Sequence, residues 1–244
     1  MLTQFEALQR RLPDDAVRYR TASPFPSIVL DDFLTPAALA AAMAEFPKPE
    51  AISDWRRMDT NDAHGRVATA NKLGYSNEFA FGPTLRDLVH ELNASPFLRY
   101  VEQLTGIKHL LPDAHMTGAG LHQYLPGAVL QIHADFNRLP GADLDRRLNL
   151  LVYLNDTWRP EWMGNLELWS ADMQQCVQSI EPVANRCVIF STTSTSFHGM
   201  PGPLECPAGM TRRSLALYYY SNGRPAEEQL PRHSTLWQTR PVDA

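Results

Sequence analysis

Apolar residues recur at helical spacing in the first part of the chain and at strand spacing in the second. The first helical series is Leu2, Phe5, Leu8 and Leu12. It predicts a short amphipathic helix, which Pro13 should end. The run SIVLDDFL then predicts a strand followed by a turn. A second helix, AALAAAMAEF, should begin at Thr35 and Pro36, an N-cap hydroxyl followed by a proline suited to the first helical position.

The rest of the first half is a polar segment followed by two further helices. Residues 51–76 are irregular in pattern, which indicates a long loop or a weak hairpin of the kind that often determines specificity. Helical patterns cover residues 83–92 and 96–104. Gly106 stands where the second of these helices should have its C-terminal cap.

From Leu110 onward the pattern changes to short β-forming runs bounded by Gly, Pro, Asn and Asp. The runs are HMTGAGLHQY, AVLQIHAD, RLNLLVYLN, NLELW, QCVQSI, RCVIFST and RSLALYYYS. Helices followed by many short strands predict an α+β fold, mainly β, with a helical layer against an antiparallel sandwich or barrel. We expect a single domain with a mostly helical part over residues 1–106, a β core over 107–224 and a C-terminal tail over 225–244.

Composition narrows the class of protein. The chain has 244 residues, 44% of them hydrophobic and 20% charged, which is typical of a globular protein. Its net charge of −5 argues against nucleic acid as a partner, because phosphate binding needs clustered Lys and Arg. No segment has the run of apolar residues that a secretory signal or a membrane span requires. The three cysteines include no CxxC pair, so we predict reduced thiols and a cytoplasmic location.

A candidate metal site lies at the end of the run AVLQIHAD. His133 and Asp135 are two positions apart, so a strand would place both side chains on one face. His198 follows 65 positions later, and another strand of a closed sheet can return it to the same place. Two histidines and a carboxylate form the ligand set of non-haem iron(II) oxygenases. The alternative is a solvated His–Asp pair, because a single H-x-D match is a weak signal.

A candidate anion site follows His198. Arg212 and Ser214 share one face of the strand SLALYYYS, where a guanidinium and a hydroxyl can bind the carboxylate of a dicarboxylate co-substrate. Arg213 points to the opposite face and is expected at the surface. The alternative is that both arginines are solvated charges at the strand end.

Five blocks resemble the prolyl-4-hydroxylase-like branch of the 2-oxoglutarate- and iron(II)-dependent oxygenases. In order they are HQYLPGAVLQIHADFN, RRLNLLVYLNDTW, GNLELW, NRCVIFSTTSTSFHG and RRSLALYYYS, within residues 121–221. The order of the blocks is far more specific than any single motif. The resemblance implies a double-stranded β-helix, a squashed barrel of two antiparallel sheets with the iron near one open end.

The resemblance also implies roles for particular residues. His133, Asp135 and His198 match the iron ligands, and Arg212 with Ser214 matches the pair that binds the far carboxylate of 2-oxoglutarate. The residues expected beside the co-substrate are Tyr153, Tyr124, Asn149 and Leu151. For the two tyrosines the alternative is a core aromatic with a polar tip. Dioxygen would be the second co-substrate, with ascorbate as a possible reductant.

The chain departs from the family pattern at two places. Met163-Gly164 stands where the family has Gly-Gly, and the insertion PLECPAGMT lengthens the link between His198 and Arg212. Neither change removes a ligand, although the insertion can act as a lid or shift the anchor. Asp135 argues against a halogenase, since related halogenases lack this carboxylate.

We therefore predict a hydroxylase with an unidentified substrate, a small molecule being favoured because no appended peptide-binding domain is visible. A protein hydroxylase of the prolyl type is the alternative, and a non-enzymatic metal-binding β-barrel module is a third hypothesis. The candidate substrate contacts are Asn137, Arg138, Trp158 and Trp162. Each of these can equally be an ordinary residue at the rim of the site. The sequence leaves the oligomeric state open.

Overall fold

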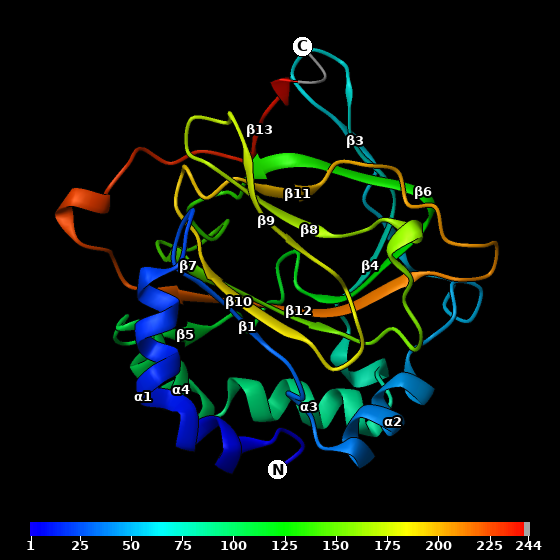
Figure 1. The fold of residues 1–244 in the computed structure, drawn as a ribbon, viewed down its shortest axis with the longest axis horizontal. Helices are drawn as coiled ribbons and strands as arrows, with labels where there is room; N and C mark the ends of the chain where they lie inside the picture. The colour runs from blue at the N-terminus through cyan, green and yellow to red at the C-terminus, as the bar shows by residue number, and fades with distance from the viewer. Residues whose placement is uncertain (242–244) are drawn as a thin grey trace.

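The structure, a computed structural model that describes residues 1–241, has a helical layer beneath one curled sheet (Figure 1). The helices are α1 (Phe5–Thr21), α2 (Pro36–Glu45), α3 (Pro83–Asn93) and α4 (Ser95–Thr105). Their buried side chains pack against the outer face of the sheet in one core that includes Leu92, Phe97, Tyr100, Leu150, Leu217 and Tyr219. The predicted α+β, mainly β, fold is confirmed. None of the helices in the described part of the chain is long and apolar enough to cross a membrane.

The prediction that Pro13 ends the first helix is wrong. Helix α1 continues through Pro13 to Thr21, although a proline inside a helix removes a hydrogen bond and costs about 3 kcal/mol. Tertiary packing offsets this cost, because the turns after Pro13 bury Ala16 and Tyr19. The Tyr19 hydroxyl also lies 2.7 Å from Ser191 Oγ, which ties the helix to the sheet.

The other helices follow their local signals. Thr35 caps α2 by accepting a hydrogen bond at its Oγ1 from Ala38 N at 3.2 Å, as predicted. Gly106 ends α4 in the left-handed conformation with φ of 82°, where glycine has no steric penalty. The start of α2 and the end of α4 are therefore determined by residues within a few positions of each helix end.

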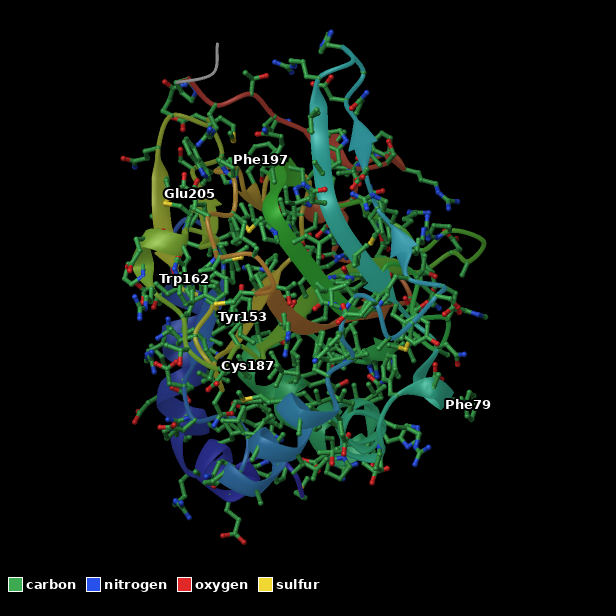
Figure 2. The ribbon with its side chains drawn as sticks, turned by 90° about the vertical axis from the view of Figure 1, so that its right-hand side faces the viewer. Phe79, Tyr153, Trp162, Cys187, Phe197 and Glu205 are labelled. Carbon is green, nitrogen blue, oxygen red and sulfur yellow. The ribbon has the colours of Figure 1, made fainter. Side chains whose placement is uncertain are left out.

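The sheet is antiparallel throughout its printed pairings and curls into a half-barrel. Its main path runs in the order β1 (Ser27–Leu30), β10 (Cys187–Ser191), β7 (Asp145–Tyr153), β12 (Arg212–Ser221), β6 (Gly120–Ala134), β11 (His198–Met200), β8 (Leu166–Trp169) and β9 (Cys176–Ile180). The short strand β5 (Leu111–Pro112) pairs with β12. Inside the curl, Tyr153 is fully buried, whereas Phe79 on the periphery is 84% exposed (Figure 2).

Strand β6 joins the two halves of the site because it is long enough to pair with several partners. Residues 120–124 pair with β12, whereas its far end pairs with β11. The predicted runs HMTGAGLHQY and AVLQIHAD contribute to this single strand. As a result, the end that carries the candidate metal ligands and the end beside Arg212 belong to one continuous backbone.

The segment predicted as a long loop or weak hairpin adds a wall to the half-barrel. It contains β2 (Arg56–Arg57), β3 (Thr60–Asn61) and the nine-residue strand β4 (Val67–Tyr75), which pairs with β6. Strand β4 has the sequence VATANKLGY, in which Asn, Lys and Gly are poor strand formers. Pairing with β6, whose partner residues lie 46 to 61 positions away, defines this strand.

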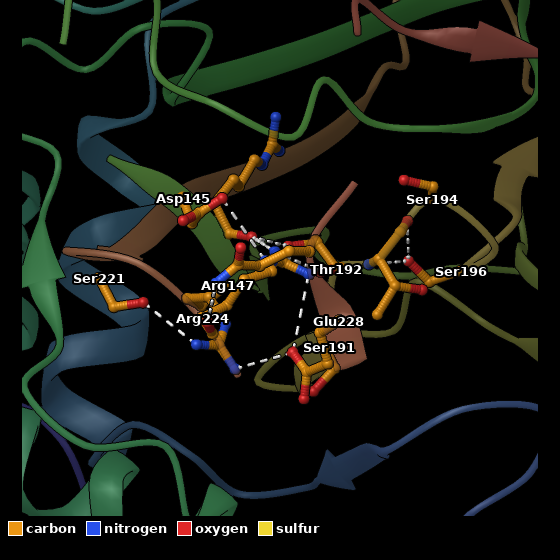
Figure 3. Close-up of polar contacts among 12 residues, drawn as sticks. Asp145, Arg147, Ser191, Thr192, Ser194, Ser196, Ser221, Arg224 and Glu228 are labelled. Atoms are coloured by element: carbon orange, nitrogen blue, oxygen red, sulfur yellow. Dashed lines mark hydrogen bonds and ion pairs between the residues drawn. The ribbon is translucent and has the colours of Figure 1, made fainter. Parts of the chain in front are cut away.

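Residues 222–238 form a segment that we call the C-terminal strap. It carries η3 (Ala226–Glu228) and then β13 (Leu236–Trp237), which pairs with the end of β6. An ionic network attaches its start to β7 (Figure 3). Arg147 binds Ser221 and Glu228, and Arg224 donates to the carbonyl of Arg146 at 2.5 Å. The strap is therefore part of the folded barrel. The last three residues of the tail predicted over 225–244 lie outside the described residues.

Candidate active site

Three side chains converge at the end of the half-barrel where β6 and β11 pair. His133 and His198 stand opposite each other in the register of these strands, with ring centroids 4.5 Å apart. Asp135 Oδ1 lies 3.6 Å from His133 Nε2, and Asp135 Oδ2 lies 3.4 Å from His198 Nε2. All three ligand atoms lie within 4.8 Å of one another, so a single metal ion can contact each of them.

The fold brings the strands close enough for this convergence. Gly199 follows His198, and a Cβ at this glycine would lie 2.7 Å from Leu130 O and 2.8 Å from Gln131 O. Any other residue would push β11 away from β6. The absence of a side chain at position 199 thus helps to set the distance between the two histidines.

Both imidazoles are held with Nε2 directed at the cluster. His133 Nδ1 lies 2.8 Å from Gln131 O, and His198 Nδ1 lies 2.9 Å from Ser196 O. A carbonyl can only accept, so Nδ1 carries the proton and the Nε2 lone pair is free for a metal. Burial and the neighbouring His133 lower the pKa of His198 to about 4, which favours the neutral ring that metal binding needs.

Asp135 is held as an anion by two buried partners. Asn149 donates from Nδ2 to Asp135 Oδ2 at 2.8 Å, and Arg146 Nη2 lies 3.2 Å from the same oxygen. Burial by itself would raise the pKa of Asp135, but Arg146, His198 and His133 outweigh it and hold the pKa well below its ordinary value. An anionic carboxylate with two neutral imidazoles fits a divalent metal ion.

The candidate anion site lies in the same barrel as the metal cluster. Arg212 is 4% exposed and donates from Nε to Gly164 O at 2.7 Å and from Nη2 to Tyr153 Oη at 3.1 Å. Its guanidinium carbon lies 5.1 Å from the ring centroid of Tyr124. Within the described residues, no carboxylate forms an ion pair with Arg212, so its charge remains available for a ligand.

One cavity, which we call the inner chamber, connects the metal cluster with Arg212. Eight residues proposed from the sequence line it: His133, Asp135, His198, Arg212, Ser214, Asn149, Leu151 and Tyr124. Tyr153 stands beside it, opposite Ser214 in the strand register and within hydrogen-bond distance of Arg212. The structure thus brings all the predicted metal and co-substrate residues together.

The two departures from the family pattern lie behind Arg212. Gly164 has φ of 84°, and a Cβ there would lie 2.7 Å from Leu204 Cδ1 and 3.2 Å from Arg212 Cδ. The inserted segment folds onto the barrel wall, because Leu204 N donates to Ala128 O at 2.9 Å and the Leu204 side chain is buried. The insertion therefore supports the wall beside the anchor.

The four candidate substrate contacts lie away from the inner chamber. Asn137 binds the strap, since its Nδ2 donates to Pro231 O and its Oδ1 accepts from His233 N, each at 2.9 Å. Arg138 pairs with Asp143 at 2.6 Å. Trp158 and Trp162 contact each other edge to face and pack with Leu204 in a small apolar cluster. A direct role for these four in substrate binding stays a prediction.

A second cavity, which we call the outer chamber, contains residues that sequence reasoning missed. Its walls include residues of β2, β4, β7, β12, the end of β6 and the strap, and it shares His133, Asp135 and Lys72 with the inner chamber. Trp237 of the strap lines it, with its ring centroid 4.9 Å from that of His133. No local signal marked this residue, because its position depends on the pairing of β13 with β6.

Comparisons with known proteins agree with this geometry. Residues 119–220 match the family model described as the 2OG-Fe(II) oxygenase superfamily. No curated protein matches the chain. A Trichoplax adhaerens prolyl hydroxylase, solved with a peptide of hypoxia-inducible factor, has TM-score 0.64 and 15% identity, covering 89% of this chain and 92% of its own.

Two further solved structures share the fold. A Pseudomonas putida prolyl-4-hydroxylase has TM-score 0.58 and 19% identity over 87% of this chain and 100% of its own. The carbocyclase SnoK from nogalamycin biosynthesis, described as non-heme and α-ketoglutarate-dependent, has TM-score 0.53 and 15% identity over 87% of this chain and 85% of its own. The double-stranded β-helix and the family resemblance predicted from the sequence are confirmed: these solved structures share the fold, and residues 119–220 match the model of the 2OG-Fe(II) oxygenase superfamily.

Proposed function

We propose that this 2-oxoglutarate- and iron(II)-dependent oxygenase is a hydroxylase with iron bound by His133, Asp135 and His198. In this proposal Arg212 and Ser214 bind the far carboxylate of 2-oxoglutarate. The observation that supports it is the inner chamber itself, which has a metal-type cluster and a buried guanidinium without an acidic partner on its walls. The match of residues 119–220 to the oxygenase family model argues against the hypothesis of a non-enzymatic binding module.

When bound, iron(II) and 2-oxoglutarate together activate dioxygen and supply the oxidising power. The protein contributes position and charge. Asn149 and Arg146 keep Asp135 anionic and oriented, while two backbone carbonyls fix the imidazoles. Burial raises the pKa of Tyr153, so its hydroxyl stays protonated and can accept from Arg212 while donating to a carboxylate.

Aromatic side chains cover part of the cluster. The Phe190 ring centroid lies 4.7 Å from that of His198, and the Trp237 ring covers His133 from the strap. With a substrate in the outer chamber, these rings would help to exclude water from the metal site.

A small molecule is the substrate class that we favour. The outer chamber shares His133 and Asp135 with the inner chamber, and several separate segments line it, among them β2, β4, the end of β6 and the strap. Such walls suit a small molecule or one side chain better than a broad protein surface. The solved structures with this fold include oxygenases of both kinds, so a protein hydroxylase is the second candidate. We also propose a cytoplasmic location, because the three cysteines are free.

Two substitutions test the proposed site. Asp135→Ala should abolish binding of iron(II), measured as metal content after anaerobic reconstitution. Arg212→Met should leave metal binding intact and weaken 2-oxoglutarate binding by about 10- to 150-fold, the equivalent of losing hydrogen bonds to a charged group. The 2-oxoglutarate affinity can be followed by the absorbance that develops when it binds to the iron-loaded protein without oxygen.

Arg213→Met is the matched control, since Arg213 is the next residue on β12 and its guanidinium lies over the Phe46 ring, 5.5 Å from the centroid. This variant should bind metal and 2-oxoglutarate as the unmodified protein does. Equal effects of the two arginine substitutions, or normal metal affinity in Asp135→Ala, would contradict the proposal.

A further inference from the structure

Two buried cations of the active-site cavities, Arg212 and Lys72, have no carboxylate partner among residues 1–241. Lys72 is 8% exposed, and the contact recorded for its ammonium is with the face of Tyr124, at 5.4 Å from the ring centroid. 2-Oxoglutarate accounts for the charge of Arg212 under the proposed function. It leaves the charge of Lys72 without a counterpart.

Lys72 and Arg212 lie on opposite sides of Tyr124. In the sheet register, Tyr124 of β6 stands opposite Lys72 of β4 and opposite Arg212 of β12, so the three side chains lie in a row on one face. Arg212 lines the inner chamber, whereas Lys72 lines both chambers. The ammonium therefore borders the space that the co-substrate does not fill.

The sum of the charges in a site that holds iron(II) and 2-oxoglutarate also leaves Lys72 without a negative counterpart. The two positive charges of iron(II) and the one of Arg212 equal the negative charges of Asp135 and a bound 2-oxoglutarate dianion. The positive charges of Arg146, Lys72 and Arg56 around the outer chamber are then not balanced by a further negative charge, whereas Arg57 is paired with Asp59 at 2.8 Å. The outer chamber thus has an excess of positive charge.

A buried ammonium without an anion is costly, because it has lost its water. Burial accordingly lowers the pKa of Lys72, with Arg212 and Arg146 acting in the same direction and Tyr218 and Asp135 opposing. A carboxylate that enters the outer chamber would regain much of the lost stabilisation. The remaining walls include the aromatic side chains of Phe136, Tyr218 and Trp237.

We propose that the outer chamber takes a substrate with a carboxylate group, which binds Lys72, and an apolar body, which packs against these aromatic side chains. The inference rests on the proposed function only in assigning Arg212 to 2-oxoglutarate. Within reach of the metal cluster, such a substrate would be held at both ends, by charge at Lys72 and by ring contacts near Trp237.

The experiment uses the full chain loaded with nickel(II) and saturated with 2-oxoglutarate, and two probes measured by isothermal titration calorimetry. Phenylacetate combines an aromatic ring with a carboxylate, and phenylacetamide is its uncharged counterpart. Phenylacetate should bind at least tenfold more tightly than the amide without displacing 2-oxoglutarate. Lys72→Met should weaken phenylacetate binding at least tenfold and change 2-oxoglutarate affinity less than threefold.

Lys48→Met, which removes an exposed lysine outside both chambers, is the control and should bind both ligands normally. Thermal unfolding separates binding from a structural role. Methionine removes the buried charge and keeps the length of the chain, so Lys72→Met should melt no lower than the unmodified protein, and a lower melting temperature would contradict the inference. Lys72→Gln provides a second, polar replacement.

Several results would overturn the inference. Phenylacetate that fails to bind, binds no better than the amide, or competes with 2-oxoglutarate would exclude an anion site in the outer chamber. A tenfold loss of 2-oxoglutarate affinity in Lys72→Met would assign this lysine to the co-substrate. Failure of the proposed function is seen separately, because 2-oxoglutarate would then not bind. Phenylacetate binding can still be measured on the nickel-loaded protein without 2-oxoglutarate.

Discussion

Replacing Tyr153 with phenylalanine should weaken 2-oxoglutarate binding without affecting metal binding. The substitution removes one hydroxyl, which accepts from Arg212 Nη2 at 3.1 Å, and keeps the ring that lies 4.8 Å from the guanidinium carbon. Arg212 retains its bond to Gly164 O at 2.7 Å, so the guanidinium stays in the chamber but loses one of two orienting contacts.

The size of the effect follows from the kind of bond that is lost. A hydrogen bond to a charged group contributes about 1.5–3 kcal/mol, and a co-substrate carboxylate can satisfy part of the freed guanidinium. We therefore expect a loss of about 1–2 kcal/mol, or roughly 5- to 30-fold in the dissociation constant of 2-oxoglutarate. Anaerobic titration of the iron-loaded protein, with absorbance as the signal, measures this constant directly.

Tyr219→Phe is the matched control. Tyr219 is fully buried in β12, and its hydroxyl donates to Leu92 O at 3.0 Å on the helical side of the sheet. Its loss should lower the free energy of unfolding by about 1 kcal/mol and leave 2-oxoglutarate binding unchanged. A dissociation constant within twofold of normal for Tyr153→Phe, or an equal change in both variants, would refute the proposed link between Tyr153 and Arg212.

Three further outcomes are expected. Asn149→Leu should weaken metal binding about 10- to 100-fold in a competition titration, because Asp135 loses a hydrogen bond that orients it; unchanged affinity would contradict this. Gly164→Ala should destabilise the protein by about 1–2 kcal/mol in urea unfolding, since its Cβ would meet Leu204 at 2.7 Å and its φ is positive; normal stability would show that the wall can shift. In metal-free protein, folded His198 has a pKa of about 4, whereas the unfolded residue protonates near pH 6.5. The free energy of unfolding should therefore fall by up to about 3 kcal/mol as the pH is lowered from about 6.5 to about 4, and His198→Gln should reduce this loss.

The parts of the site that follow from local sequence were predicted well. His133 and Asp135 share a face because they are two residues apart on a strand, and Thr35 caps α2 through a bond to a residue three positions away. The five ordered blocks indicated the family resemblance, which implied that His198 would lie beside His133 and Asp135, and the structure places these three side chains together. The alternation of side chains along β12 was enough to predict that Arg212 and Ser214 share one face of the strand.

The missed parts depend on contacts between distant segments. Lys72 lies in a sequence of poor strand formers, and its place in the cavity wall comes from pairing with Tyr124. Asn137 lies two positions after the candidate ligand Asp135, yet its amide binds residues of the strap almost a hundred positions away. Pro13 failed as a helix stop because the burial of Tyr19 outweighed a local rule.

The strap also sets the order in which the site can be completed during synthesis. Residues 231–238 leave the ribosome after every predicted metal ligand, so a nascent chain presents His133 before Trp237 can pair beside it. Copper and zinc bind imidazole nitrogen more tightly than iron(II) does, and an uncovered ligand is open to all three. Under the proposed function, the ion that the site takes up would therefore depend on the metals present before β13 pairs with β6.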